Sequence, residues 1–339
     1  MIIQFENNIN ENQQNRVSEV LDKIGYKKNE VITQFGKYWV CIGKKEFDIR
    51  KIGSLEGVRD IHRVSDSYKL VSGKWKVDPT IVDLGDGVKI GGDHFQIMMG
   101  PCSIESDKQI EETIEFLKHN NLKIMRGGVY KPRSSPYAFR GLGLDGLKIW
   151  SEIAKEAGVK IISEVMQVSQ IESMIDYVDV FQVGARNSQN FNLLDELGKV
   201  DKAVLLKRGM SGTIEELLSS AEYIFSHGNE KLMLCERGIR TYENAYRNTF
   251  DINAIPILKD KSHLPVISDP SHGIGIRKYV APVTLSSVIA GADSTIIEVH
   301  SCPEKAYSDG QQTLDFQQAE KLINDIKATR NLFISNLIG

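Results

Sequence analysis

The 339-residue sequence has no long hydrophobic run, few cysteines and almost no excess of either charge. No segment approaches the roughly 18 apolar residues that a membrane-spanning helix needs. Four cysteines in a chain of this length do not suggest a disulfide framework. A formal net charge of −3 gives no reason to expect nucleic acid or an anionic membrane as a partner. The start of the chain turns polar at Glu6 and does not resemble a signal peptide, so we expect a cytoplasmic protein.

The composition, 41% hydrophobic and 26% charged, is typical of a globular protein with one large domain or a large and a small one. Residues 1–70 show the order strand, helix, strand, strand, helix, strand, at residues 2–6, 10–24, 30–35, 38–42, 47–52 and 58–64. This order predicts a small ferredoxin-like α+β domain. Residues 71–94 are predicted to form a connector with a β-hairpin, whose turn is Gly85-Asp86-Gly87.

The remaining residues, 95–339, alternate between apolar strand-like runs and helical patterns, for example at residues 108–119, 151–157, 214–225 and 316–333. The eight runs are residues 95–99, 123–126, 160–165, 180–183, 203–206, 232–234, 265–268 and 295–299. This number and spacing predict a (β/α)₈ TIM barrel, with a doubly wound parallel sheet as the alternative. Cysteine, histidine, glutamate, lysine and arginine residues follow directly after several of the runs. The carboxyl ends of the strands are where barrel enzymes build their active sites. Their placement favours the barrel.

Four residues near the ends of predicted strands form a candidate metal site. They are one thiol, one imidazole and two carboxylates: Cys102, His272, Glu298 and Asp309. Such a set is a plausible mixed-ligand site for a divalent transition metal. A structural zinc module takes its ligands from close spacings along the chain, whereas these four come from distant strands. The pattern therefore indicates a site assembled by the fold, although His and acidic residues at strand ends are common without a metal.

A second set consists of cations at the same strand ends: Arg126, Lys131, Arg133, Arg186, Lys207 and Arg237. Any one of them could simply solvate a surface. Several together at one barrel mouth would repel each other strongly unless an anionic ligand lay between them. Neighbouring glycines allow backbone amides to approach phosphate oxygens, and the arginine fork suits phosphate and carboxylate. The set therefore predicts a small, multiply anionic substrate, and two phosphates would fit.

Together the motifs resemble the 3-deoxy-D-arabino-heptulosonate 7-phosphate (DAHP) synthases, in the short microbial type related to 3-deoxy-D-manno-octulosonate 8-phosphate synthases. The resemblance runs from about residue 100 to residue 312 and is carried by GPCSIES, RGGVYKPRSS, VGARN, LLKRG, CERGIRTYE, SDPSHG, IEVH and SDGQQ. It implies a metal-dependent transferase that condenses phosphoenolpyruvate with erythrose 4-phosphate and releases phosphate, in the first step of the shikimate pathway. The N-terminal segment is similar to a ferredoxin-like extension of some members that binds an aromatic amino acid. We therefore expect feedback inhibition by tyrosine or phenylalanine, and a homotetramer.

The resemblance also implies roles for individual residues. One divalent ion, Mn, Fe, Co or Zn, would be held by Cys102, His272, Glu298 and Asp309. Phosphoenolpyruvate would be bound by Arg126, Lys131, Arg186, Lys207 and Arg237. The aldose phosphate would be bound by Arg133, Ser134 and Ser135, with Asp269 near the sugar. Catalytic roles would fall to the metal ligands Cys102 and His272 and to Lys131, a candidate proton donor to the developing alkoxide.

Two other functions within this resemblance stay open. A 3-deoxy-D-manno-octulosonate 8-phosphate synthase would use arabinose 5-phosphate, and such enzymes typically have Lys-Ala-Asn-Arg-Ser where this chain has Lys131-Pro132-Arg133-Ser134-Ser135. The difference favours the four-carbon sugar. The other alternative is a non-catalytic aromatic amino acid sensor on a decayed barrel, and the complete set of ligands and cations argues against it. A Schiff base on Lys131 or Lys207 is a less favoured chemistry, because the neighbouring cations fit phosphate binding better.

Overall fold

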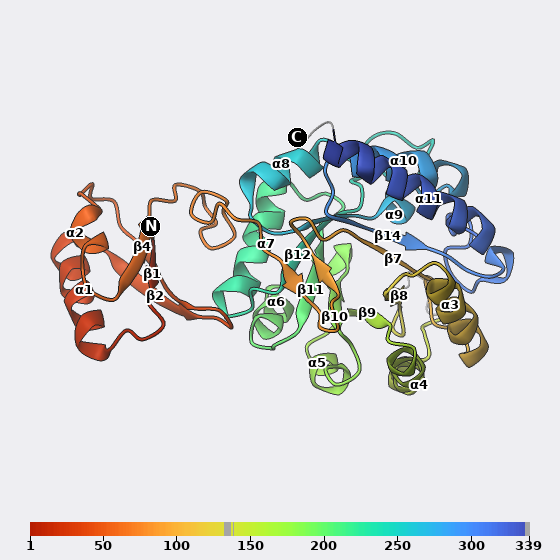
Figure 1. The fold of residues 1–339 in the computed structure, drawn as a ribbon, viewed down its shortest axis with the longest axis horizontal. Helices are drawn as coiled ribbons and strands as arrows, with labels where there is room; N and C mark the ends of the chain where they lie inside the picture. Colours follow the sequence, from red (N-terminus) through yellow and green to blue (C-terminus); the bar gives the residue numbers. More distant parts are fainter. Residues whose placement is uncertain (132–136, 138, 336–339) are drawn as a thin grey trace.

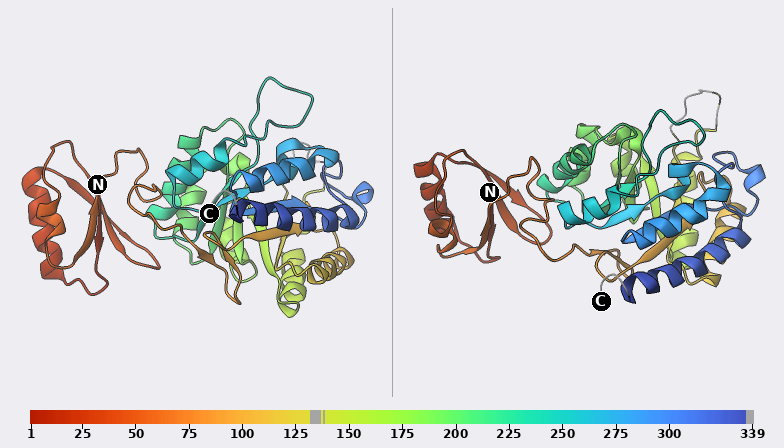
Figure 2. Two further views of the ribbon diagram at one scale, coloured as in Figure 1. Left: turned by 45° about the horizontal axis from the view of Figure 1, so that its top comes forward. Right: turned by 90° about the horizontal axis from the view of Figure 1, so that it is seen from above.

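The computed structural model describes residues 1–131, 137 and 139–335. A small N-terminal unit stands to one side of a larger barrel, and the two are joined by a connector (Figure 1). Two further views show the same arrangement, with helices surrounding the strands of the larger part (Figure 2). Among the described residues, no helix is both long and apolar enough to cross a membrane.

The N-terminal unit is a four-stranded antiparallel sheet in the order β2-β3-β1-β4. Its elements are β1 (Ile2–Phe5), α1 (Glu11–Ile24), β2 (Lys27–Ile32), β3 (Lys37–Ile42), α2 (Arg50–Gly53) and β4 (Val58–His62). One face of the sheet carries Ile3, Phe5 and Trp39, which pack with Val17 and Leu21 of α1. The predicted order of elements is therefore present in the structure.

Two elements of this unit, β2 and α2, differ most from their predicted bounds. Strand β2 begins at Lys27 and not at residue 30 because α1 ends at Gly25, in a left-handed conformation with φ of 77°, and the chain turns at once into the sheet. As an edge strand it buries only Val31, so its first residues lack the alternating apolar pattern that marks a strand. The second helix, predicted over residues 47–52, is the four-residue α2.

The connector contains the predicted hairpin, with β5 (Val82–Asp83) paired antiparallel to β6 (Lys89–Ile90). Val82, Val88 and Ile90 pack with the side chains that fill the barrel interior, such as Met98 and Leu205. Parallel strands place their active-site loops at their carboxyl ends. The hairpin packs into the barrel interior away from these ends and so leaves them free for a site.

The larger part is a closed barrel of eight parallel strands, as the sequence predicts, and not a doubly wound sheet. The strands are β7 (Gln96–Gly100), β8 (Ile124–Gly127), β9 (Lys160–Val165), β10 (Val180–Val183), β11 (Ala203–Lys207), β12 (Leu232–Glu236), β13 (Val266–Ser268) and β14 (Ser294–Glu298). Each strand is buried on both faces for most of its length, which is why the sequence shows continuous apolar runs.

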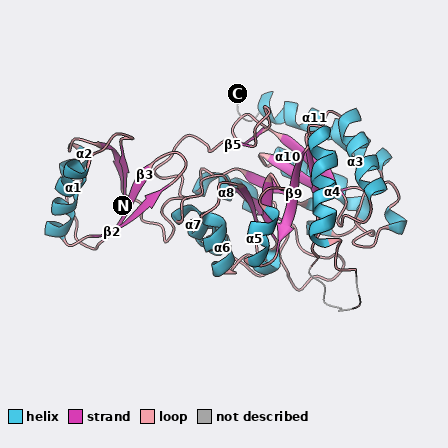
Figure 3. Cartoon of the chain, turned by 90° about the horizontal axis from the view of Figure 1, so that it is seen from below, coloured by secondary structure: helices cyan, strands magenta, loops and turns pink. Residues whose placement is uncertain are grey.

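Helices cover the outside of the barrel (Figure 3). They are α3 (Asp107–His119), α4 (Gly143–Glu156), α5 (Ser169–Met174), α6 (Phe191–Gly198), α7 (Ile214–Ser226), α8 (Ala254–Lys261), α10 (Arg277–Ile289) and α11 (Phe316–Phe333). The short helix α9 (Pro270–Ile274) instead follows β13 directly, at the carboxyl ends of the strands. Helix α4 starts eight residues before the predicted start at residue 151, because Leu147 and Trp150 bury its first turns against the barrel. Glycines at 141, 143 and 146 hid this start in the sequence.

The N-terminal unit contacts the barrel at the end opposite the carboxyl ends of the strands. The turn between β2 and β3 reaches the segment that leads into β12, where Glu230 N donates to Gln34 Oε1 at 3.0 Å. Thr33 Oγ1 donates to the Glu230 carboxylate in the same contact. Tyr38 packs edge-on against Trp75 of the connector, with ring centroids 5.4 Å apart. This interface joins the small unit to the barrel far from the mouth.

Candidate active site

The predicted site residues that the structure describes gather at the carboxyl ends of the barrel strands. Arg126 lies in β8, Lys207 ends β11 and Glu298 ends β14. Cys102 and Arg237 follow β7 and β12, His272 lies in α9 after β13, and Asp309 lies in the loop between β14 and α11. Arg133, Ser134 and Ser135, the predicted aldose phosphate ligands, lie outside the described residues.

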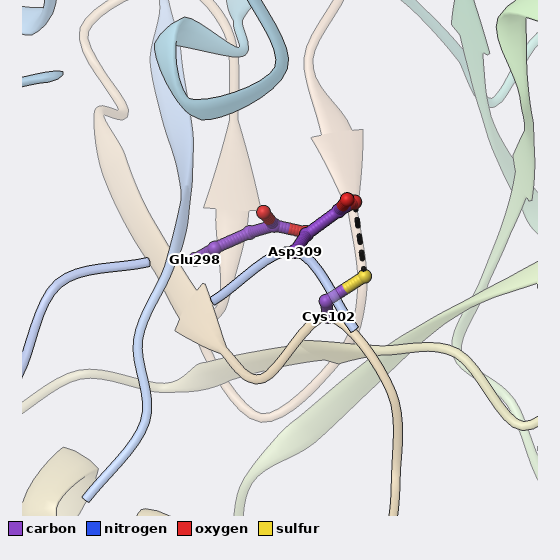
Figure 4. Close-up of side chains that lie close together, drawn as sticks. All are labelled: Cys102, Glu298 and Asp309. Atoms are coloured by element: carbon purple, nitrogen blue, oxygen red, sulfur yellow. Dashed lines mark hydrogen bonds between the residues drawn. The ribbon is translucent and has the colours of Figure 1, made fainter. Parts of the chain in front are cut away.

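Three of the four predicted metal ligands converge on one point. Cys102, Glu298 and Asp309 each offer a ligand atom, and these atoms all lie within 4.8 Å of one another (Figure 4). Cys102 Sγ is 3.4 Å from Asp309 Oδ2. The fourth, His272, reaches the same carboxylates, with Nε2 at 3.4 Å from Glu298 Oε1 and 3.8 Å from Asp309 Oδ2. A thiol, an imidazole and two carboxylates that face one another fit a divalent transition metal.

Asp269 orients the imidazole of His272. It caps the short helix α9, where its Oδ1 accepts from the backbone N–H of His272 at 3.1 Å. The same carboxylate lies 2.9 Å from Nδ1 of His272, and this contact leaves Nε2 directed at the metal-ligand carboxylates. Its Oδ2 also accepts from Lys207 Nζ at 2.6 Å. Burial opposes ionisation of Asp269, but His272 and Lys207 hold its pKa well below the usual value.

The charges at the metal-ligand cluster favour a bound cation. Burial and the neighbouring Glu298 raise the pKa of the Cys102 thiol to about 11, against the opposing charge of Lys131. Burial also opposes ionisation of Glu298, but His272 and Arg126 hold its pKa below the usual value. Burial opposes ionisation of Asp309 as well, but His272 and Arg247 lower its pKa to about 2. Glu298 and Asp309 are therefore charged beside a protonated thiol. A cation at this point would offset their repulsion and favour the thiolate form.

A cavity of about 100 Å³ lies beside this cluster. All five cations predicted to bind phosphoenolpyruvate line it, namely Arg126, Lys131, Arg186, Lys207 and Arg237. His272 and Asp309 line it too, so it is continuous with the metal-ligand cluster. The fold thus places several cations around one small space, as the sequence predicted, and a multiply charged anion would balance them.

Two of these cations, Arg126 and Lys131, also contact residues of the metal-ligand cluster. Arg126 is almost fully buried, and its Nη1 donates to Glu298 Oε1 and to Pro101 O, both at 2.9 Å. Lys131 Nζ donates to Cys102 O at 2.9 Å and lies 3.1 Å from Cys102 Sγ. Arg126 and Lys131 therefore touch the metal-ligand cluster as well as the cavity.

One cation of this cavity, Arg247, was missed by the sequence reasoning. It lies in the long irregular segment between β12 and α8, and no predicted strand end marks its position. Its only signal in the sequence is a short Tyr246-Arg247-Asn248 run among polar residues.

Comparisons with known proteins agree with this geometry. Residues 76–333 match the model of the DAHP synthetase I family. A phospho-2-dehydro-3-deoxyheptonate aldolase of Thermotoga maritima is 48% identical over 277 residues, which cover 82% of this chain and 82% of that protein. A 2-dehydro-3-deoxyphosphooctonate aldolase of Syntrophobacter fumaroxidans is 29% identical over 259 residues, which cover 71% of this chain and 88% of that protein.

Solved structures show the same likeness. The crystal structure of the Thermotoga maritima phospho-2-dehydro-3-deoxyheptonate aldolase (DAHP synthase) superimposes with a TM-score of 0.78 and 42% identity, covering 98% of this chain and 97% of the other. A truncated form of 3-deoxy-D-arabino-heptulosonate 7-phosphate synthase from Thermotoga maritima gives a TM-score of 0.74 and 45% identity. It covers 78% of this chain and 97% of its own length.

Proposed function

Because the chain belongs to the DAHP synthetase I family, we propose that it condenses phosphoenolpyruvate with erythrose 4-phosphate and releases inorganic phosphate. This reaction is the first step of the shikimate pathway. The observation that carries the proposal is the cavity lined by five predicted phosphoenolpyruvate ligands, which adjoins a cluster of side chains that could hold a metal ion. A cation cage of this kind can hold two mutually repelling phosphates close enough for a carbon–carbon bond to form.

Cys102, His272, Glu298 and Asp309 would hold one divalent ion, Mn, Fe, Co or Zn. When bound, that ion supplies Lewis-acid polarisation of the aldehyde oxygen or orients a water molecule. Asp269 fixes the ring of His272 and pairs with Lys207, so we assign it the orientation of these two side chains in addition to the sugar contact expected from the sequence.

The remaining steps fall to the cations. Arg186, Lys207 and Arg237 bind the phosphate and carboxylate of phosphoenolpyruvate, and Arg126 links this site to Glu298. Arg133, Ser134 and Ser135 bind erythrose 4-phosphate. Lys131, whose ammonium lies beside Cys102, donates a proton to the oxygen of the aldehyde as the new bond forms. Water then adds at C2 of the former enol, and the C–O bond to phosphate breaks.

Phosphate release from phosphoenolpyruvate tests the function. We expect turnover with erythrose 4-phosphate, loss of turnover with a chelator and recovery on addition of Mn²⁺. The proposed metal site faces the substrate cavity, so the bound ion would be both catalytic and accessible to a chelator. Arabinose 5-phosphate, assayed in parallel, is expected to give little release. Turnover with arabinose 5-phosphate alone would assign the octulosonate reaction, and turnover with neither sugar would leave a non-catalytic sensor.

We further propose that the N-terminal unit is a ferredoxin-like domain that binds tyrosine or phenylalanine and inhibits the enzyme, which we expect to be a homotetramer. The fully antiparallel sheet in the order β2-β3-β1-β4 supports the ferredoxin-like topology. The proposed division is residues 1–70 for this domain, 71–94 for the connector and 95–339 for the catalytic barrel. An effector would change the population of one arrangement of the N-terminal unit relative to the barrel, and that arrangement would control access to the barrel mouth.

Removing residues 1–64 is expected to abolish inhibition by either amino acid and to preserve turnover. The cut leaves the connector intact, where the backbone N–H groups of Leu70 and Val71 donate to Glu222 of α7 and Ser262 donates to Val71 O. A cut after these residues would expose buried contacts of the barrel. Initial rates with and without tyrosine and phenylalanine measure the effect. Inhibition that persists in the shortened enzyme would place the effector site on the barrel.

A further inference from the structure

The loop between β12 and α8 holds the helix that carries His272. The backbone N–H of Arg247 donates to Ile274 O at 3.1 Å, and Asn248 Nδ2 donates to His272 O at 2.9 Å. Gly275, which ends α9 with φ of 68°, packs so closely on Arg247 that an added Cβ would lie 2.3 Å from Arg247 Cβ. The backbone of this loop and α9 are therefore one packed unit.

The side chain of Arg247 crosses from this unit to the loop between β14 and α11. Its Nη1 donates to Gln312 Oε1 at 2.7 Å and lies 3.5 Å from Asp309 Oδ1. Gln312 is fully buried, and its Nε2 donates to Glu298 Oε2 at 2.6 Å. A continuous chain of contacts thus runs from Arg247 through Gln312 to Glu298, with a branch to Asp309.

Arg247 holds one end of this chain and Glu298 the other. An arginine side chain only donates hydrogen bonds and a carboxylate only accepts them, so an amide placed between them must turn its oxygen to Arg247 and its NH₂ to Glu298. Without the guanidinium, the amide oxygen of Gln312 would lose its donor, and the side chain that donates to Glu298 would be held at one end only. Asp309 would at the same time lose the cation beside its Oδ1.

We propose that Arg247 is a positioning residue for the metal site, which orients Glu298 through Gln312 and holds Asp309 directly. The same residue ties these two carboxylates to the helix of His272, so three of the proposed ligands share one anchor. This inference rests on the proposed metal site. Outer partners of metal ligands of this kind typically change metal affinity by about 10- to 100-fold when removed.

Titration of the metal-free, full-length protein with Co²⁺ tests the proposal. The readout is the near-ultraviolet absorption of a thiolate-to-cobalt charge-transfer band, which depends on Cys102. Arg247→Met is expected to raise the Co²⁺ dissociation constant about 10- to 100-fold, and Arg247→Lys, which can still donate to Gln312, is expected to recover most of the affinity. Arg240→Met is the matched control, because Arg240 lies in the same loop and is exposed.

A double-mutant cycle with Gln312→Leu separates positioning from general loss of structure. If Arg247 acts through Gln312, each single variant weakens Co²⁺ binding and the double variant weakens it by much less than the product of the two effects. Thermal unfolding of each variant checks that it folds. If Arg247→Met does not fold, Arg247→Lys and Gln312→Leu carry the same comparison.

Two results would overturn the proposal. Unchanged Co²⁺ affinity in folded Arg247→Met, or fully independent effects of Arg247 and Gln312, would show that the arginine does not position the ligands. Failure of the proposed metal site looks different, since the wild-type protein would then show no Cys102-dependent band. That result would remove the metal site and this inference with it.

Discussion

Replacement of Cys102 by serine is expected to abolish high-affinity metal binding and, with it, turnover. The cysteine sulfur lies 3.4 Å from Asp309 Oδ2 within the metal-ligand cluster, and a serine hydroxyl has neither the softness nor the acidity of a thiol. Loss of a direct ligand should exceed the roughly 10- to 100-fold loss of affinity that follows removal of an outer partner. Metal content after dialysis and phosphate release with added Mn²⁺ measure the two effects.

Cys302→Ser is the matched control for this change. Cys302 is a partly exposed thiol whose Sγ lies 4.0 Å from Glu304 Oε2, and it is not among the clustered ligand atoms of the described residues. We expect this variant to keep its metal and its activity. A Cys102→Ser enzyme that retains both metal and turnover would contradict the ligand role of Cys102.

Replacement of Lys131 by methionine is expected to lower kcat by about 10²- to 10⁴-fold, the range typical of a general acid. The ammonium group of Lys131 lies 3.1 Å from Cys102 Sγ and lines the cation-rich cavity, so it sits between the proposed metal and the proposed phosphoenolpyruvate site. Steady-state rates with both substrates measure kcat and the two KM values. Lys131→Arg keeps the charge but is a weaker acid, so it should restore substrate binding more than kcat.

Two controls accompany this change. Lys305→Met removes an exposed lysine and should leave all three kinetic parameters unchanged. The Cys102-dependent cobalt band should persist in Lys131→Met, which would show that the metal site is intact. A normal kcat in Lys131→Met would assign proton donation to another group.

The barrel could be predicted because its strands are buried on both faces and therefore appear as continuous apolar runs between helices. The edge strand β2 could not be bounded in the same way, since only Val31 is buried and the rest of the strand is polar or exposed. Helix α4 was predicted too short because the glycines at its start weaken a helical pattern, although Leu147 and Trp150 bury that part of the helix. Prediction of element bounds from the local sequence pattern fails where tertiary packing outweighs the intrinsic helix or strand propensity.

The candidate site likewise has a part that the sequence predicted and a part that it did not. The residue types and their positions near predicted strand ends marked Cys102, His272, Glu298 and Asp309 as a candidate metal site and marked a group of cations as a candidate anion site. Their individual roles were predicted from the family resemblance. Their chemistry is a property of each side chain, and strand ends can be recognised locally. Arg247 could not be found in this way, because an irregular loop has no period that tells which of its side chains turns toward the mouth.

Sequence alone therefore determined the class of fold, the family resemblance and the chemical character of the site, since each of these depends on residue identity and on short-range periodicity. Only the tertiary structure decided which atoms meet: the 3.4 Å approach of Cys102 to Asp309, the orientation of His272 by Asp269, and the contact chain from Arg247 through Gln312 to Glu298. These contacts join segments far apart in the chain. Their geometry is set by closure of the barrel and by the packing of its loops, and neither leaves a local trace in the sequence.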